Sequence, residues 1–122
     1  MKTPNQLEQR LKKYFKVDLT DKETQEKLAK AKLLCELKLE LLDKVSSFIS
    51  IPRMVVLKKG CKMGFEKRFL RRELSETLSF EDDLYKAQNR LQRLRDIIYK
   101  ARKGQNLSLI EYNWLQKELK KV

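Results

Sequence analysis

Residues 21–50 contain neither proline nor glycine, and this stretch constrains the fold more than any other. Thr20 and Glu23 form a capping-box pattern at its start, and Pro52 follows its end. Apolar residues recur along it at spacings of three and four: Leu28, Ala31, Leu34, Cys35, Leu37, Leu41, Leu42, Val45, Phe48 and Ile49. On a helix they spread over more than half the circumference, whereas a surface helix has an apolar stripe of about 100°. We therefore predict a long helix, at about 21–50, with neighbours on two sides.

Further segments on both sides of this stretch have the features of helices. A short helix is predicted over about 3–16, where Thr3 and Gln6 form a capping box. Ser79 is a predicted cap for a later helix, and Gly104 is expected to close it. That helix has an apolar seam with heptad spacing: Leu84, Ala87, Leu91, Leu94, Ile98 and Ala101. A last helix is predicted to begin at Ser108, which forms a capping box with Glu111.

The composition agrees with a helical fold, since the 122 residues include only three glycines and two prolines. Lys, Glu, Leu and Arg dominate, and all four favour helices. The length suits one domain with a real core. We predict an all-α, single-domain helical bundle over residues 1–122, with four to five helices around the long central helix.

The segment after Pro52 leaves two alternatives open. Residues 53–65 are compatible with a short hairpin or with a helix. A lone hairpin is marginally stable, so we favour a short helix over about 52–59, with Gly60 in the left-handed position that ends it. A further helix is then expected over about 62–78. Lys38 lies within the apolar arc of the long helix, and we expect its amine to reach water past a neighbour; a desolvated catalytic lysine is the alternative.

Positive charge is concentrated in one segment of this basic chain. The net charge is +12, yet residues 21–51 contain six basic and six acidic residues. Residues 52–78 contain eight basic and three acidic residues. Such an excess favours contact with polyanions, although it also keeps a small protein soluble. The pattern therefore points to a non-enzymatic binding protein that contacts nucleic-acid phosphates through the basic segment 58–72.

Ten basic residues form the predicted phosphate-binding set: Lys58, Lys59, Lys62, Lys67, Arg68, Arg71, Arg72, Lys86, Arg93 and Lys100. Phe65 and Phe69 lie among the first seven and are candidates for stacking on unpaired bases. The short helix, the turn at Gly60 and the helix after it resemble a helix-turn-helix. Residues that read base edges are scarce on the second helix, which argues against sequence specificity. The choice between DNA and RNA stays open.

Sequence features of enzymes and metal sites are missing. The chain has no nucleophile elbow, phosphate-binding loop or dinucleotide-binding glycine pattern, and it has no histidine. The two cysteines are 26 residues apart and do not match a metal-binding spacing. We therefore expect no catalytic activity, no metal and no cofactor. No stretch approaches the length of a membrane span, and no secretion signal begins the chain. This predicts a cytoplasmic protein, with signal-independent delivery into a host cell as an alternative.

A second functional hypothesis concerns protein partners. The apolar arc of residues 21–50 and the heptad seam of 84–101 are both wide. If the other helices do not cover them, the exposed stripe becomes an interface. The protein would then be a regulator, adaptor or inhibitor that binds an acidic protein or forms a homodimer.

Overall fold

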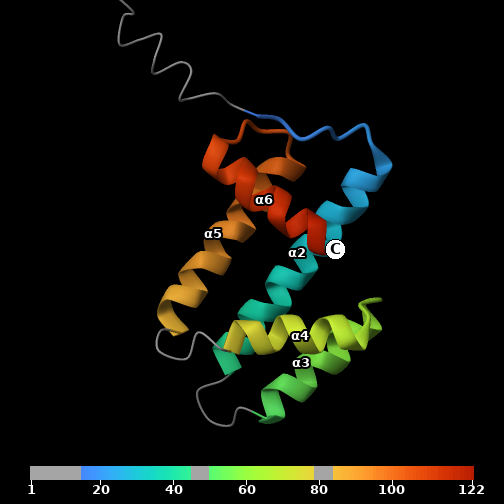
Figure 1. Cartoon of the computed structure of the whole chain (residues 1–122), viewed down its shortest axis with the longest axis vertical. Helices are drawn as coiled ribbons and strands as arrows, with labels where there is room; N and C mark the ends of the chain where they lie inside the picture. The colour runs from blue at the N-terminus through green and yellow to red at the C-terminus, as the bar shows by residue number, and fades with distance from the viewer. Residues whose placement is uncertain (1–14, 45–49, 79–83) are drawn as a thin grey trace, which may run out of the picture. The chain divides into compact units, whose positions relative to one another are not determined.

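The computed structural model describes residues 15–44, 50–78 and 84–122. These residues form five helices, shown in Figure 1: α2 (Lys22–Lys44), α3 (Ser50–Lys62), α4 (Lys67–Leu78), α5 (Leu84–Arg102) and α6 (Leu109–Lys121). The predicted all-α fold is confirmed, and residues 53–62 are helical. The helix predicted over about 3–16 and the cap at Ser79 fall on positions outside the described residues, although Phe15 itself is not helical.

The chain divides into two compact units. One unit comprises residues up to 32 together with 94–122, and we call it the terminal unit. The other comprises residues 33–93 and is called the middle unit. The divisions fall inside α2 and α5, so each of these two helices contributes to both units.

The long helix expected at about 21–50 is α2. Its cap is Asp21, whose carboxylate accepts the backbone N–H of Glu23 at 3.1 Å and the hydroxyl of Thr24 at 3.0 Å. Thr20 instead donates its hydroxyl to Asp18 at 2.6 Å, so the helix starts where the sequence predicts but with the neighbouring residue as its cap. Residues 45–49 lie outside the described part, and position 50 already belongs to α3.

Pro52 lies in the first turn of α3 instead of acting as a stop. Proline is tolerated there because the first N–H groups of a helix have no intrahelical partner. Gly60 does not end the helix either, contrary to the prediction. The left-handed residue is Gly64, with φ of 100°. Gly64 N–H donates to the Cys61 carbonyl and Phe65 N–H to the Gly60 carbonyl, both at 3.1 Å, which is a Schellman motif.

Gly60 allows close packing of three helices in the middle unit. A β-carbon at this position would lie 2.6 Å from Cδ1 of Leu70 on α4 and 3.1 Å from Cδ1 of Leu37 on α2. Glycine is therefore required for close approach and not for backbone conformation. Figure 1 shows α3 and α4 side by side, joined by the turn at Gly64. Arg53 of α3 also donates to the Ser75 hydroxyl of α4 at 2.7 Å.

Among the described residues, the apolar arc of α2 and the apolar side of α5 contribute most of the buried apolar side chains. The buried core residues on these two helices are Leu28, Ala31, Leu34, Cys35, Leu37, Leu41, Leu42, Ala87, Leu91, Leu94, Ile97, Ile98 and Ala101. Within the middle unit, the Cys35 thiol donates to the Leu91 carbonyl at 3.1 Å and links α2 with α5. Leu84, the first residue of the predicted seam, is exposed. Among the described helices, none is long and apolar enough to cross a membrane.

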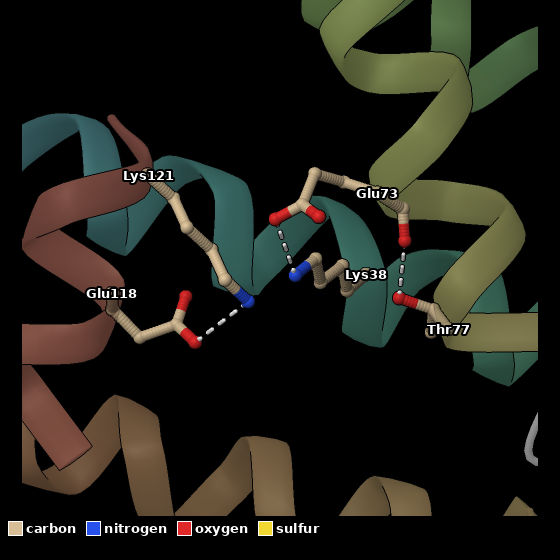
Figure 2. Close-up of polar contacts among 5 residues, drawn as sticks. All are labelled: Lys38, Glu73, Thr77, Glu118 and Lys121. Carbon is tan, nitrogen blue, oxygen red and sulfur yellow. Dashed lines mark hydrogen bonds and ion pairs between the residues drawn. The ribbon is translucent and has the colours of Figure 1, made fainter.

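Lys38 forms a buried ion pair. The prediction that its amine reaches water is therefore wrong. Its Nζ lies 3.5 Å from Oε1 of Glu73 on α4, and the two residues are only 7% and 2% exposed (Figure 2). The hydroxyl of Thr77 donates to the Glu73 backbone carbonyl at 2.8 Å. Burial of both charges requires them to be paired, because an isolated ion inside a protein is strongly destabilising.

The terminal unit is held by contacts between residues far apart in the sequence. Phe15 and Leu107 form an antiparallel bridge with two backbone hydrogen bonds of 2.8 Å. The Phe15 ring stacks on Tyr112 of α6, with ring centroids 4.7 Å apart. The predicted capping box of α6 is confirmed, since Ser108 and Glu111 each accept the other's backbone N–H. Gly104 closes α5 with φ of 72°, as the sequence predicts.

Candidate functional site

Helix α4 has two faces of opposite character. Its interior has no glycine or proline and is rich in Arg, Leu and Glu, which favours helix formation. The buried face follows the spacing of three and four: Leu70, Glu73, Leu74 and Thr77. At about 100° per residue, Arg68 and Arg72 lie about 160° from Leu70. Arg71 lies between these faces and is also exposed.

The arginines of α4 face solvent and have no acidic partner among the described residues. No carboxylate in that part of the chain lies within ion-pair distance of Arg68, Arg71 or Arg72. The guanidinium of Arg72 lies 5.8 Å from the centroid of the Phe69 ring, a cation–π contact. Their hydrogen-bonding groups are therefore available to a ligand.

The lysines on α3 fall into two groups. Lys58 and Lys62 are one turn apart and exposed, as is Lys67 at the start of α4. Lys59 instead donates to Oε2 of Glu40 on α2 at 2.9 Å, and Glu40 also accepts from Lys44 at 2.8 Å. The hydrogen bonds from Lys44 and Lys59 lower the pKa of the Glu40 carboxyl below its usual value. Lys59 is thus partly neutralised within the fold.

We call the remaining six residues the cationic cluster: Lys58, Lys62, Lys67, Arg68, Arg71 and Arg72. All six are exposed and lie within 15 residues of sequence around the turn between α3 and α4. Between positions 58 and 72 the only acidic residue is Glu66. This density of like charge creates a positive potential that attracts anions.

The predicted second ridge on α5 is less available. Lys86 and Arg93 are exposed, but both take part in further interactions. The amine of Lys100 donates to Oε2 of Glu111 on α6 at 3.1 Å. Burial works against ionisation of Glu111, but hydrogen bonds from Ser108 and Lys100 outweigh it and lower the pKa of this carboxyl. Lys100 therefore stabilises the terminal unit, and we leave these three residues out of the cluster.

The two candidate stacking rings lie next to each other. Phe65 and Phe69 are each partly exposed, and their rings stack with centroids 6.2 Å apart and an angle of 18° between the planes. Each ring thus covers part of the other, and Arg72 lies over Phe69. Arg72 is thus the arginine beside the pair, and stacking of the rings on bases stays a prediction.

Sequence reasoning missed two features of this region. Glu40 neutralises Lys59, and only its pairing with Lys44 was visible as a spacing of four on one helix. Met54 and Val55 are exposed on α3, which the sequence did not single out. Conversely, the described residues of the two apolar stripes that motivated a protein interface are buried, apart from Leu84. Val45, Phe48 and Ile49 of the first stripe lie outside the described residues. A homodimer or an acidic protein partner remains a prediction, without support from the described part of these stripes.

Comparison with known proteins gives no relative: the chain matches no protein-family model, no curated protein and no solved structure. The described residues also contain no group of three potential metal ligands among Cys, Asp and Glu. The candidate site is therefore defined by its geometry and charge.

Proposed function

We propose that this protein binds nucleic acid through its phosphates, using the cationic cluster of α3 and α4. The supporting observation is the exposure of six cationic side chains around one turn, with no carboxylate partner for the three arginines among the described residues. Neutralisation of phosphates by such side chains releases the counterions condensed on the nucleic acid, and this release drives binding. The buried face of α4 fixes the helix that presents the arginines.

The arginines make the largest contribution to phosphate contact. A guanidinium donates two parallel hydrogen bonds to phosphate oxygens, whereas a lysine amine acts as a point charge. Arg68 and Arg72 are one helical turn apart, so they reach phosphates along the same side of α4. Contact with phosphates alone does not read sequence, and we therefore propose binding without sequence specificity.

The adjacent aromatic pair favours an unpaired strand over a duplex. A base that stacks on the exposed part of Phe65 or Phe69 lies close to the arginine that contacts its phosphate. In a duplex the bases are stacked on each other and are not accessible to these rings. Phe65→Leu is expected to weaken single-strand binding by about fivefold or more and to leave duplex binding nearly unchanged.

The principal test measures binding of labelled single-stranded and duplex oligonucleotides over a range of salt concentrations. The variant Arg68→Ala/Arg71→Ala/Arg72→Ala, called the arginine variant, is compared with the wild-type protein. The slope of log affinity against log salt is expected to fall by about 2–3 units, since each phosphate contact contributes about 0.7–0.9. Circular dichroism checks that the variant remains folded.

A matched control separates the cluster from net charge. Lys30→Ala/Lys117→Ala/Lys120→Ala removes the same charge from exposed positions in the terminal unit. This control variant is expected to retain most of the wild-type affinity and slope. Equal weakening by the two variants would show that the net charge of +12 binds nucleic acid without a site. Absence of binding by the wild-type protein at low salt would reject the proposal.

A further inference from the structure

A pocket of about 450 Å³ lies in the terminal unit, which contains none of the cationic cluster. Its volume is within the range of about 300–1,000 Å³ typical of small-ligand sites. Six residues line it: Lys32, Arg95, Asp96, Tyr99, Arg102 and Lys103. Lys32 belongs to α2, and the other five belong to the second half of α5 and the residue after its end.

The spacing of the pocket residues along α5 explains why they line the same pocket. Arg95, Tyr99 and Arg102 are separated by four and three residues, and Asp96, Tyr99 and Lys103 by three and four. Residues at these spacings lie on the same side of a helix. The opposite side of this part of α5 is the buried seam, with Ile97, Ile98 and Ala101 in the core. Because the seam is buried in the core, the basic side of α5 faces the pocket.

Cationic side chains predominate among the residues that line the pocket. Of the described residues, four cationic groups and one carboxylate, that of Asp96, line it, and Lys32 also has an interaction within the fold. In the described part of the chain, no carboxylate lies within ion-pair distance of Arg95, Arg102 or Lys103. Like charges around a concave surface repel each other, and a bound anion relieves this repulsion. Two arginines in one pocket favour phosphate groups, which accept bidentate hydrogen bonds.

Tyr99 adds an aromatic surface to this anion site. The residue is 59% exposed, and the amine of Lys103 lies 5.6 Å from its ring centroid. An exposed aromatic ring beside cations is the combination that binds a base together with its phosphate. Asp96 provides an acceptor for a hydroxyl or amino group.

We propose that this pocket binds a nucleotide, with its phosphates on Arg95 and Arg102 and its base against Tyr99. A base with its phosphate can come from two sources, a free nucleotide or one nucleotide within a single strand. This proposal does not depend on the cationic cluster, because the pocket shares no residue with it. The two proposals therefore fail or succeed separately.

The test is calorimetric titration of the full chain at low salt with ATP, inorganic tripolyphosphate and adenosine. ATP is expected to bind more tightly than tripolyphosphate, and adenosine is expected to bind weakest, since it lacks the phosphates. Arg95→Ala/Arg102→Ala should lower ATP affinity by about tenfold or more. The matched control Lys30→Ala/Lys117→Ala, which removes the same charge outside the pocket, should change it by less than about threefold.

A second variant isolates the aromatic contact. Tyr99→Leu is expected to lower ATP affinity by about fivefold or more and to leave tripolyphosphate affinity unchanged. Because Tyr99 is exposed, this variant is expected to keep the wild-type melting temperature. Equal affinity of the wild-type protein for ATP and tripolyphosphate would overturn the assignment to a nucleotide. Equal weakening by the pocket variant and its control would overturn the site.

The arginine variant distinguishes the two sources. It should bind ATP as the wild-type protein does, because its substitutions lie outside the pocket. If a short single-stranded oligonucleotide displaces ATP from this variant, the pocket accepts a nucleotide within a strand. If it does not, the pocket accepts the free nucleotide. Loss of ATP binding in the arginine variant would contradict the separate site.

Discussion

The two faces of α4 use charge in opposite ways. On the buried face, Glu73 is 2% exposed and lies 3.5 Å from the amine of Lys38. On the opposite face, Arg68 and Arg72 are exposed and have no acidic partner among the described residues. The same helix of 12 residues thus contains a charge paired within the fold and charges left to solvent.

Burial and pairing distinguish structural charge from functional charge in a basic protein. A charge that the fold uses is buried and paired, because desolvation without a partner costs several kcal/mol. A charge that is exposed and unpaired contributes little to stability. By the contacts of the described residues, the arginines of α4 belong to the second group, and Lys38 belongs to the first. The comparison predicts that substitutions on the two faces separate stability from binding.

The largest effect on stability is expected for Lys38→Met. This substitution takes the lysine away from the buried carboxylate of Glu73, which keeps its other interaction, and breaking a buried pair typically costs about 3–5 kcal/mol. The free energy of unfolding from urea denaturation, monitored by circular dichroism, provides the measurement. The double variant Lys38→Met/Glu73→Leu removes both charges and should recover most of the loss, because apolar residues replace buried pairs well. A single variant as stable as the wild-type protein would contradict the buried pair.

Adjacent positions on α4 provide the sharpest separation of the two faces. Leu70→Ala removes a fully buried side chain and is expected to lower the free energy of unfolding by about 2–5 kcal/mol. Arg71→Ala, one residue further, should change it by less than about 0.5 kcal/mol while weakening nucleic-acid binding. Parallel urea denaturation and binding titrations of both variants measure the contrast. A large stability loss for Arg71→Ala would show that this arginine has a structural role.

The helices were largely predictable because their patterns are local. The start of α2, the capping box at Ser108 and the closing Gly104 each depend on residues within a few positions of one another. The ends around α3 were not predicted. Gly60 lies inside α3 and Gly64 just after its end, and sequence alone does not tell which of the two ends the helix. The close approach of Leu70 to Gly60 and the positive φ of Gly64 show that Gly60 packs and Gly64 ends the helix.

The candidate site was predictable as a segment but not as a set of available side chains. The exposed arginines follow from the spacing of α4, because the leucines fix its buried face. The partners of Lys38, Lys59 and Lys100 come from other helices, at separations of 35, 19 and 11 residues. No periodicity encodes such pairs, so sequence alone could not remove these lysines from the surface excess.

Gly60→Ala tests the close packing beneath the cationic cluster. The added β-carbon would lie 2.6 Å from Leu70 Cδ1, so the leucine or the helix must move. Overpacking of this kind costs about 1–3 kcal/mol, partly offset by the higher helix propensity of alanine, up to about 1 kcal/mol. Thermal unfolding should show a lower melting temperature for this variant. An unchanged or higher melting temperature would mean that Leu70 moves aside at no cost.

Glu40→Gln is expected to have a small effect. It removes the carboxylate that pairs with Lys59, so that Lys59 becomes available to a ligand. Loss of the carboxylate releases Lys59, and the affinity for nucleic acid at pH 7 should rise by about two- to threefold, with a slope steeper by up to about 0.9. Glu40→Asp is the control, since it retains the charge. An unchanged affinity would mean that Lys59 lies too far from the bound phosphates to contribute.

The pH dependence of the same variant shows whether the pair also contributes to stability. Hydrogen bonds from Lys44 and Lys59 hold the pKa of Glu40 below its ordinary value of 4.5. A carboxyl with a lowered pKa in the folded state stabilises the fold above its unfolded pKa, and this stabilisation is lost as pH falls through the folded pKa. The wild-type protein should therefore exceed Glu40→Gln in unfolding free energy at pH 6–7, by about 0.2–1 kcal/mol for such a surface pair. The difference should shrink below about pH 4.5.

Measuring the difference between the two proteins cancels the similar pH responses of Asp18 and Glu111, whose pKa values are also lowered. A difference that stays constant down to low pH would mean that Glu40 stabilises the fold by packing and not by charge.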